Sequence, residues 1–191
     1  MVHYVVDIQA LKQSFNRTVF KEVAVLSLQN NAQPLVFLFK PPFAWEALLQ
    51  EHKRCNRWLE YNYHGLCWDN GEIAYKDLQE TLQQALIDSH TIFVKGLEKK
   101  NWLGEILPNK KYWIENAEDL GCPSLRKLPS IDNFSCSNHS HAGERNVCAL
   151  QNVLIVKEYL INIERTCIGW SSPRSTQGKN FVYKISIIVI E

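Results

Sequence analysis

Three residues in the last third of the chain have the chemistry and spacing of metal ligands. Cys136, His139 and Cys148 form a Cys-x2-His-x8-Cys run, and Cys148 opens an apolar helical stretch. Thiolate and imidazole groups suit a tetrahedral zinc ion. The spacing therefore predicts a zinc ion that joins a loop to the start of a helix, with a fourth ligand from elsewhere in the chain. His141 is the alternative to His139 as the imidazole ligand, and we prefer His139.

Length and composition predict one folded domain without a strong overall charge. The chain has 191 residues, of which 46% are hydrophobic and 21% charged, with a formal net charge of +1. This balance is typical of a chain that buries a core rather than staying disordered. A near-neutral chain is not a strongly electrostatic nucleic-acid or membrane binder, so any basic surface must be a local patch.

The cysteines and the N-terminus predict a location in the cytoplasm or the nucleus. The chain has six cysteines, and residues 1–7 become polar too soon for a signal peptide. No run of about 18 apolar residues is present, so we expect no membrane span. Cysteines in this setting are expected to be reduced thiols or metal ligands.

The order of the expected elements indicates the fold class. Apolar and β-branched runs predict strands at residues 4–8, 22–28, 35–40, 91–95 and 111–115. Apolar residues three and four apart predict helices at residues 43–61, 75–87, 98–107 and 144–163. A meander of three strands followed by alternating helices and strands predicts an α/β protein: a ribonuclease H-like five-stranded mixed sheet flanked by helices, with a zinc-stapled C-terminal helix.

The composition changes near the C-terminus, which suggests a domain over residues 1–165 and a tail over 166–191. The tail has a Ser/Pro/Gly-rich piece and then an almost wholly apolar, β-branched end. Such an end is either an added edge strand or a gene-model artefact, and we favour the artefact, because an unpaired strand of this composition promotes aggregation.

The would-be active site resembles that of the DEDDh group of three-prime exonucleases. That group has this fold, four carboxylates that hold two metal ions, and a histidine base. Asp7 matches the first carboxylate, but Gln9 stands where the group has a glutamate. The helix expected from Glu98 has no aspartate and places Lys100 near the expected position. His141 keeps the His-x4 spacing, but the run ends in Asn146 rather than aspartate.

The missing carboxylates at these positions would be needed to bind two catalytic metal ions. Two magnesium ions about 4 Å apart need several shared anionic oxygens to offset their mutual repulsion. Asp7 is the one certain carboxylate, so a conventional two-metal nuclease is not expected, and bound magnesium or manganese has little support. The catalytic candidates that remain are Asp7, Glu98 and His141.

The zinc-type run points to a second family with the same fold. Cys136, His139 and Cys148, followed directly by Ala149-Leu150, resemble the Maelstrom domain. That family lacks the DEDDh carboxylates and has a Glu-Cys-His-Cys zinc site. The resemblance implies that Glu22, in the segment 21–26, is the fourth ligand. Such a closed four-ligand site would hold structural zinc.

The resemblance extends weakly from about Tyr4 to Arg165 and carries functional expectations. It implies binding of single-stranded RNA, ribonuclease activity outside the lost DEDDh site, and a link to piRNA-type silencing of transposons with protein partners. Family members usually carry an HMG box before this domain. We expect none before the strand that begins at Tyr4, and the resemblance is therefore expected to be that of a stand-alone relative.

Basic and aromatic residues provide candidates for nucleic-acid contacts. Lysines near the carboxyl ends of the central strands are expected to contact phosphates: Lys95, Lys99, Lys100, Lys110 and Lys111. Three residues of one turn-rich loop are candidates for base stacking: Tyr63, His64 and Trp68. Most other tryptophans, Trp58 and Trp113 among them, are expected in the core.

Three hypotheses follow. The first is a catalytically degenerate, zinc-stabilised domain that binds single-stranded RNA. The second is a working single-stranded ribonuclease centred on Asp7, Glu98 and His141, and the third is an interaction scaffold with neither activity.

Overall fold

A computed structural model describes residues 2–15, 17–107, 112–129, 131, 136, 138–139 and 147–168, with the side chains of 165–168 excepted. Within these residues five strands form one mixed sheet in the order β3-β2-β1-β4-β5. The strands are β1 (Val2–Lys12), β2 (Thr18–Ser27), β3 (Leu35–Leu38), β4 (Ser89–Val94) and β5 (Trp113–Asn116). β1, β2 and β3 pair antiparallel, while β4 runs parallel to both β1 and β5. The predicted five-stranded mixed sheet is confirmed.

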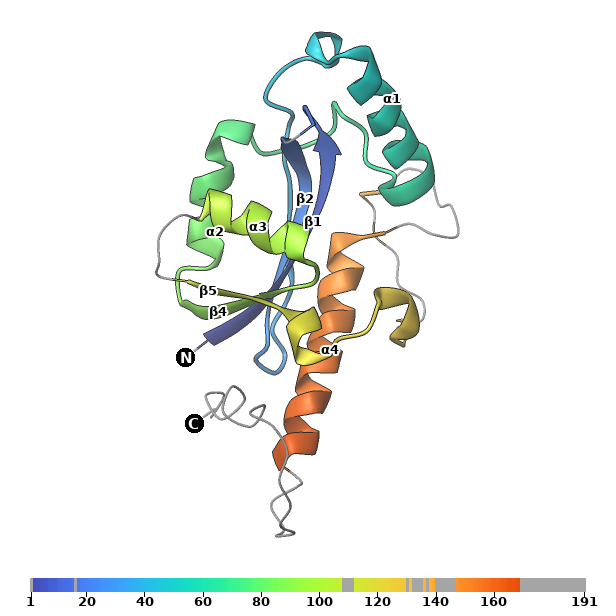
Figure 1. Cartoon of the computed structure of the whole chain (residues 1–191). Coiled ribbons are helices and arrows are strands. Elements are labelled where there is room, and N and C mark those ends of the chain that lie inside the picture. Colours follow the sequence, from blue (N-terminus) through green and yellow to red (C-terminus); the bar gives the residue numbers. More distant parts are fainter. Residues whose placement is uncertain are drawn as a thin grey trace.

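Helices flank the sheet on both faces (Figure 1). The α-helices are α1 (Gln50–Leu59), α2 (Leu78–Ala85), α3 (Leu97–Ile106) and α4 (Ala149–Ile168). A π-helical turn, η2 (Glu60–His64), continues α1 directly. Short 3-10 turns complete the described helical segments: η1 (Trp45–Ala47), η3 (Tyr75–Asp77), η4 (Ala117–Leu120) and η5 (Leu125–Lys127). None of the described helices is long and apolar enough to cross a membrane.

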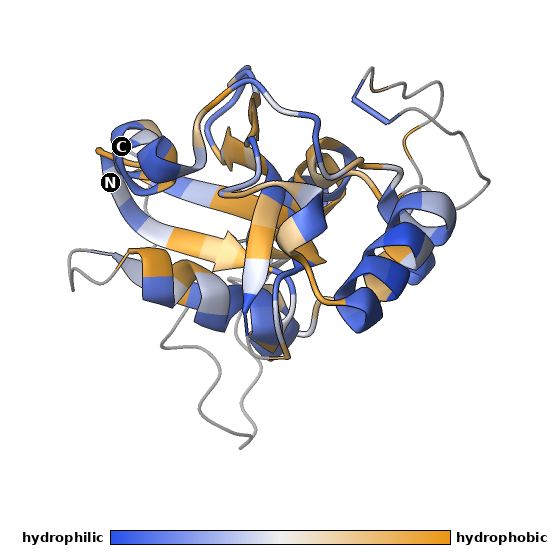
Figure 2. Ribbon diagram, turned by 90° about the horizontal axis from the view of Figure 1, so that it is seen from above, coloured by the Kyte–Doolittle hydropathy of each residue, from blue (hydrophilic) through white to orange (hydrophobic). Residues whose placement is uncertain are grey.

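Alternation along β1 creates a core on each face of the sheet. Val6 and Ile8 point into one core, together with Leu82 of α2 and Leu103 of α3. Side chains of the other parity point to the opposite face, where Val5 packs in the core that α4 covers. Figure 2 shows mostly hydrophobic strands in the middle of the molecule and helices that combine hydrophilic and hydrophobic residues around them.

The same alternation places three polar side chains of the sheet under α4. Asp7 and Gln9 share the parity of Val5 in β1, and Gln9 is paired with Glu22 of β2 across the antiparallel ladder. Successive strand residues point to opposite faces, so Asp7, Gln9 and Glu22 share the face that packs against α4. The strand register therefore assembles a polar site beneath this helix.

The last helix differs from its prediction at both ends. The prediction was a helix over residues 144–163. Val147 and Cys148 are not helical, and α4 runs from Ala149 to Ile168. The predicted domain boundary at residue 165 therefore falls inside α4. Residues 169–191, which include most of the predicted tail, lie outside the described residues.

Candidate functional site

The structure brings together the four residues that the sequence suggested as metal ligands. Glu22, Cys136, His139 and Cys148 each offer one ligand atom, and these atoms lie within 4.8 Å of one another. Glu22 comes from β2, Cys148 directly precedes α4, and the other two come from the segment between β5 and α4. The cluster thus links the sheet, a connecting segment and the last helix, and its donors could bind a metal ion.

Glu22 is a fully buried carboxylate with polar partners on two sides. It has 0% exposure, and its Oε2 accepts a hydrogen bond of 2.8 Å from the backbone N–H of Ala149. The positive end of the α4 dipole favours a negative charge at this point. Its other oxygen, Oε1, lies 3.2 Å from His139 Nε2 and 4.0 Å from Cys136 Sγ. Oε1 therefore faces the remaining ligand atoms.

The hydrogen bond of His139 fixes which ring nitrogen is available to a metal. His139 Nδ1 is hydrogen-bonded to the backbone carbonyl of His64. Because a carbonyl only accepts, Nδ1 carries the proton and Nε2 has a free lone pair. The buried Nε2 faces Glu22 Oε1 at 3.2 Å, in a geometry that does not qualify as a hydrogen bond. This backbone contact is a common way to orient a metal-bound imidazole, so the geometry of His139 fits a ligand.

The chemistry of the full donor set fits zinc. One imidazole, two thiols and one carboxylate are ligands that zinc binds at about 2.0–2.3 Å, which puts tetrahedral donors about 3.3–3.8 Å apart. The spacings around Glu22 are close to this range. Burial, followed by the charge of Glu22, raises the pKa of the Cys148 thiol above its ordinary value. A bound cation reverses this effect, because a coordinating thiol loses its proton.

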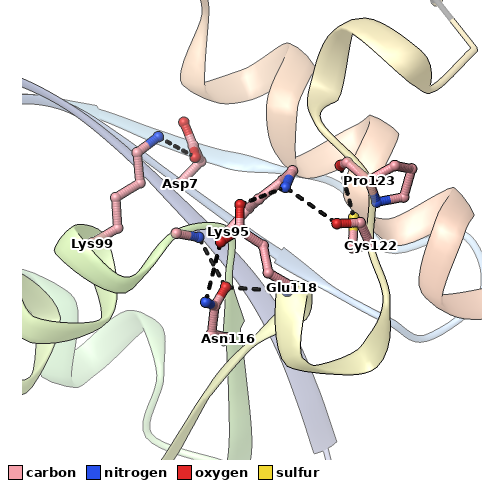
Figure 3. A network of polar contacts seen from close by, with 8 residues as sticks. Asp7, Lys95, Lys99, Asn116, Glu118, Cys122 and Pro123 are labelled. Carbon is pink, nitrogen blue, oxygen red and sulfur yellow. Dashed lines mark hydrogen bonds and ion pairs between the residues drawn. The ribbon is translucent and has the colours of Figure 1, made fainter.

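Beside this cluster lies Asp7, a buried carboxylate that accepts hydrogen bonds from three side chains. Asp7 is 2% exposed. It accepts hydrogen bonds from Gln9 Nε2 at 3.0 Å, from Asn152 Nδ2 at 2.9 Å and from Lys99 Nζ at 2.5 Å. Two amides and one ammonium therefore neutralise and solvate this carboxylate. Figure 3 shows Lys99 reaching Asp7 from α3.

These contacts correct the sequence-based assignment of the positions around Asp7. The residue of α4 that contacts Asp7 is Asn152, whereas the predicted Asn146 lies outside the described residues. The cation is Lys99 rather than Lys100. Asn152 lies four residues after Cys148, one helical turn along the start of α4, so the two side chains lie on the same side of the helix. This spacing from a predicted metal ligand is the sequence signal that could have identified Asn152.

Glu98 does not join Asp7. Its carboxylate is 65% exposed and lies 3.6 Å from Lys12 Nζ at the end of β1. The prediction that Glu98 supplies a second carboxylate beside Asp7 is therefore wrong, because α3 turns Lys99 and not Glu98 toward Asp7. The third predicted catalytic residue, His141, lies outside the described residues.

Two of the predicted phosphate-contacting lysines are occupied by contacts within the domain. Lys95 is nearly buried, and its Nζ bonds to Glu118 Oε1 at 2.9 Å and to the backbone carbonyl of Cys122 at 3.4 Å (Figure 3). Lys99 is engaged by Asp7, and Lys100 is half-buried on α3. Lys110 and Lys111 lie outside the described residues. Two of the three described lysines are thus held by carboxylates of the domain itself.

The prediction that His64 stacks on a base is corrected. Its ring is 1% exposed and accepts a hydrogen bond of 3.1 Å from the backbone N–H of Leu66 at Nδ1. Burial lowers the pKa of His64 to about 4, so the ring is neutral at pH 7. A buried neutral ring neither stacks on a base nor contacts a phosphate. Of the aromatic residues in this loop, Trp68 is also buried, whereas Tyr63 is 40% exposed.

Asp7 gives the stability of the domain a specific pH dependence. Burial raises the pKa of the Asp7 carboxyl above its ordinary value of 3.8, although Lys99 and Asn152 oppose this effect. An acid with a raised folded-state pKa binds its proton more tightly in the folded protein. The free energy of unfolding contributed by Asp7 therefore falls as the pH rises from the ordinary to the raised pKa.

We expect Asp7→Asn to remove this decline. Each tenfold difference in proton affinity corresponds to about 1.4 kcal/mol. Urea unfolding of the parent and the variant between about pH 3 and pH 7 measures the effect. The free energy of unfolding of the parent should fall relative to that of Asp7→Asn as the pH rises. A difference between the two proteins that stays constant across this range would contradict the assignment.

Comparisons with known proteins identify the fold. No family model matches the chain, and no curated protein matches its sequence. Among solved structures, E. coli exonuclease I in complex with a 5cy-dA13 oligonucleotide matches with a TM-score of 0.53 and 12% identity, over 86% of this chain and 40% of that chain. The zinc ion bound form of the E. coli exonuclease I–ssDNA complex matches with a TM-score of 0.54 and 11% identity, over the same shares.

The likeness shows the fold alone, a five-stranded mixed sheet flanked by helices that is consistent with a ribonuclease H-like fold. This chain spans about two fifths of the length of these neighbours. At such low identity the likeness carries no residue of their sites over to this chain.

Proposed function

We propose that this protein is a catalytically degenerate ribonuclease H-like domain that binds single-stranded RNA and is stabilised by zinc. The observation that carries the proposal is the contact between Lys99 and Asp7. The ammonium lies 2.5 Å from the carboxylate, in the place where a metal-dependent nuclease of this fold needs a metal ion. A fixed cation there removes the need for a metal and disfavours its entry through charge repulsion.

The other neighbours of Asp7 support the loss of two-metal chemistry. Gln9 and Asn152 turn amide N–H groups toward the carboxylate, so neither offers an anionic oxygen. Two divalent ions need several shared anionic oxygens. The second hypothesis, a ribonuclease centred on Asp7, Glu98 and His141, loses support because Glu98 is paired with Lys12 at the surface.

Zinc has a structural role in this proposal. Glu22, Cys136, His139 and Cys148 would complete four-coordination, which leaves no open position for a reacting water. When bound, zinc would supply a positive charge that compensates the buried Glu22 and the two thiolates. The chain's own contribution is to fix the ligands: the α4 N-terminus holds Glu22 and the backbone of His64 holds His139.

The kind of nucleic acid is inferred from two sources. The solved neighbours include complexes with single-stranded DNA, which supports a single strand as the ligand of a domain with this fold. The likeness of the Cys-His-Cys run to the Maelstrom domain favours RNA and a place in piRNA-type silencing, with protein partners in the cytoplasm or nucleus. Lys100, with Lys110 and Lys111, would supply phosphate contacts.

A gel-shift experiment tests this function. Purified full-length protein is mixed with labelled single-stranded RNA, single-stranded DNA and duplex RNA of one sequence. We expect a shift with single-stranded RNA that weakens as salt rises, because phosphate contacts release counterions. Asp7→Asn, which keeps the shape of the side chain, should bind as the parent does. Failure to shift any single strand would overturn the proposal and favour an interaction scaffold.

A further inference from the structure

The outward face of α1 and η2 carries exposed aromatic and basic side chains together. Trp58 is 57% exposed, Tyr61 66% and Tyr63 40%. Arg54 and Arg57 are also exposed. Trp58 lies four residues after Arg54, and Tyr61 lies four after Arg57, so each arginine has an aromatic neighbour one helical turn away. We call Arg54, Arg57, Trp58, Tyr61 and Tyr63 the α1 face.

The opposite side of α1 is fixed to the domain, so the α1 face points to solvent. His52 and Asn56, four residues apart, are buried. Asn56 Oδ1 accepts a hydrogen bond of 2.7 Å from the backbone N–H of Lys12, and its Nδ2 donates one of 2.9 Å to the carbonyl of the same residue. This pair of bonds holds α1 against the carboxyl end of β1. Trp58, expected in the core from its helical spacing, is therefore turned outward.

The far end of the α1 face is fixed by the candidate metal cluster. The backbone carbonyl of Tyr63 accepts a hydrogen bond of 3.0 Å from the N–H of Val147, next to Cys148. The carbonyl of His64 accepts the hydrogen bond from His139 described above. The side chain of Asn56 thus holds α1, and the carbonyls of Tyr63 and His64 hold η2. A segment fixed in this way loses less entropy when a ligand binds.

The charges of this segment favour an anionic ligand. The carboxylate of Glu60 is half-buried and accepts a hydrogen bond of 2.8 Å from Cys67 Sγ. That of Glu51, in the first turn of α1, lies 3.7 Å from His52 Nε2. Neither carboxylate pairs with Arg54 or Arg57 among the described ion pairs. The guanidinium of Arg57 lies over the ring of Trp45, 5.7 Å from its centroid. Exposed aromatic rings beside guanidinium groups combine the two contacts that single-stranded nucleic acids make with proteins.

We propose that the α1 face is a stacking surface for a single-stranded nucleic acid. Bases stack on Trp58 and Tyr61, while Arg54 and Arg57 contact the phosphates. The inference rests on the proposed function and gives it a contact surface outside the Asp7 site. An acidic or aromatic protein could contact the same side chains, so the experiment has to distinguish a protein partner from a single-stranded nucleic acid.

Fluorescence anisotropy with a short labelled single-stranded RNA tests the proposal on the full chain. Trp58→Ala and Tyr61→Ala should each weaken binding by about 10-fold, the effect of one lost stacking contact. Trp58→Phe and Tyr61→Phe keep an aromatic ring and should retain most of the affinity. Arg54→Gln should lower the slope of log affinity against log salt by about 0.7.

The matched control is Trp113→Ala. Trp113 is 65% exposed on β5, so its replacement removes a comparable aromatic surface elsewhere and should leave binding unchanged. Thermal unfolding should be the same in all these variants because the side chains are exposed. If the parent binds RNA and Trp58→Ala binds equally well, the stacking surface is refuted while the proposed function stands. If the parent binds no single strand, both are refuted, and the α1 face is then left to a protein partner.

Discussion

Cys148→Ser is expected to abolish metal binding and to lower the free energy of unfolding by several kcal/mol, because binding of structural zinc is coupled to folding. Cys148 is buried where α4 begins and contributes one of four donors within 4.8 Å. Its loss leaves the buried carboxylate of Glu22 without full compensation. Metal content of the purified protein, with thermal unfolding before and after a chelator, measures the effect.

Cys122→Ser is the matched control for this substitution. Cys122 is also a buried thiol, 5% exposed, but it packs in the core under α4 and lies outside the metal cluster. The control should keep its zinc and lose at most about 1–2 kcal/mol from the altered core contact. Equal thermal stability of the parent with and without the chelator would contradict a structural zinc site.

Lys99→Met is expected to destabilise the domain by about 2–4 kcal/mol at neutral pH, near the range for breaking a buried ion pair. Methionine keeps the length and apolar character of the side chain but removes the ammonium that lies 2.5 Å from Asp7. Asp7, 3% exposed by its side chain, is then left with two neutral amide donors. The loss should shrink as the pH falls, because a protonated Asp7 no longer needs a cation.

A double-mutant cycle isolates this pair. In Asp7→Asn/Lys99→Met neither charge remains, so the double variant should be more stable than Lys99→Met alone. Lys100→Met, on the next residue of α3, is the control and should change the free energy of unfolding by about 0.5 kcal/mol or less. If Lys99→Met and Lys100→Met behave alike, the ammonium does not compensate Asp7.

The sequence predicted the sheet well because the strands have strong local signals. β1 alternates buried side chains between two cores, and β2 is buried from Val19 to Ser27, as expected for a strand covered on both faces. The metal cluster could also be predicted from the sequence. Cys136, His139 and Cys148 have ligand spacing, and the family resemblance supplied Glu22, more than one hundred residues away in the chain.

The contacts of Asp7 were harder to predict because they depend on tertiary geometry. The motif spacing led to Asn146, which lies outside the described residues, and missed Asn152, the α4 residue that contacts Asp7. The cation depended on the rotation of α3, in which adjacent residues point about 100° apart: Lys99 faces the carboxylate, while Glu98 faces solvent.

The orientation of Trp58 could not be read from helical spacing either. Apolar positions three and four apart place it on a core-facing stripe in the sequence. The polar residues His52 and Asn56 are buried instead, because Asn56 satisfies the backbone of Lys12. A hydrogen bond to a distant strand thus reversed the expected face of the helix.

Simultaneous measurement of binding and cleavage tests the central claim most directly. Purified protein is incubated with labelled single-stranded RNA in magnesium, in manganese and in chelator, and both the shifted complex and the intact strand are followed. The Lys99–Asp7 contact predicts a shift with no cleavage in either metal. Metal-dependent cleavage that disappears in Asp7→Ala would contradict it and would show that the site is an active nuclease.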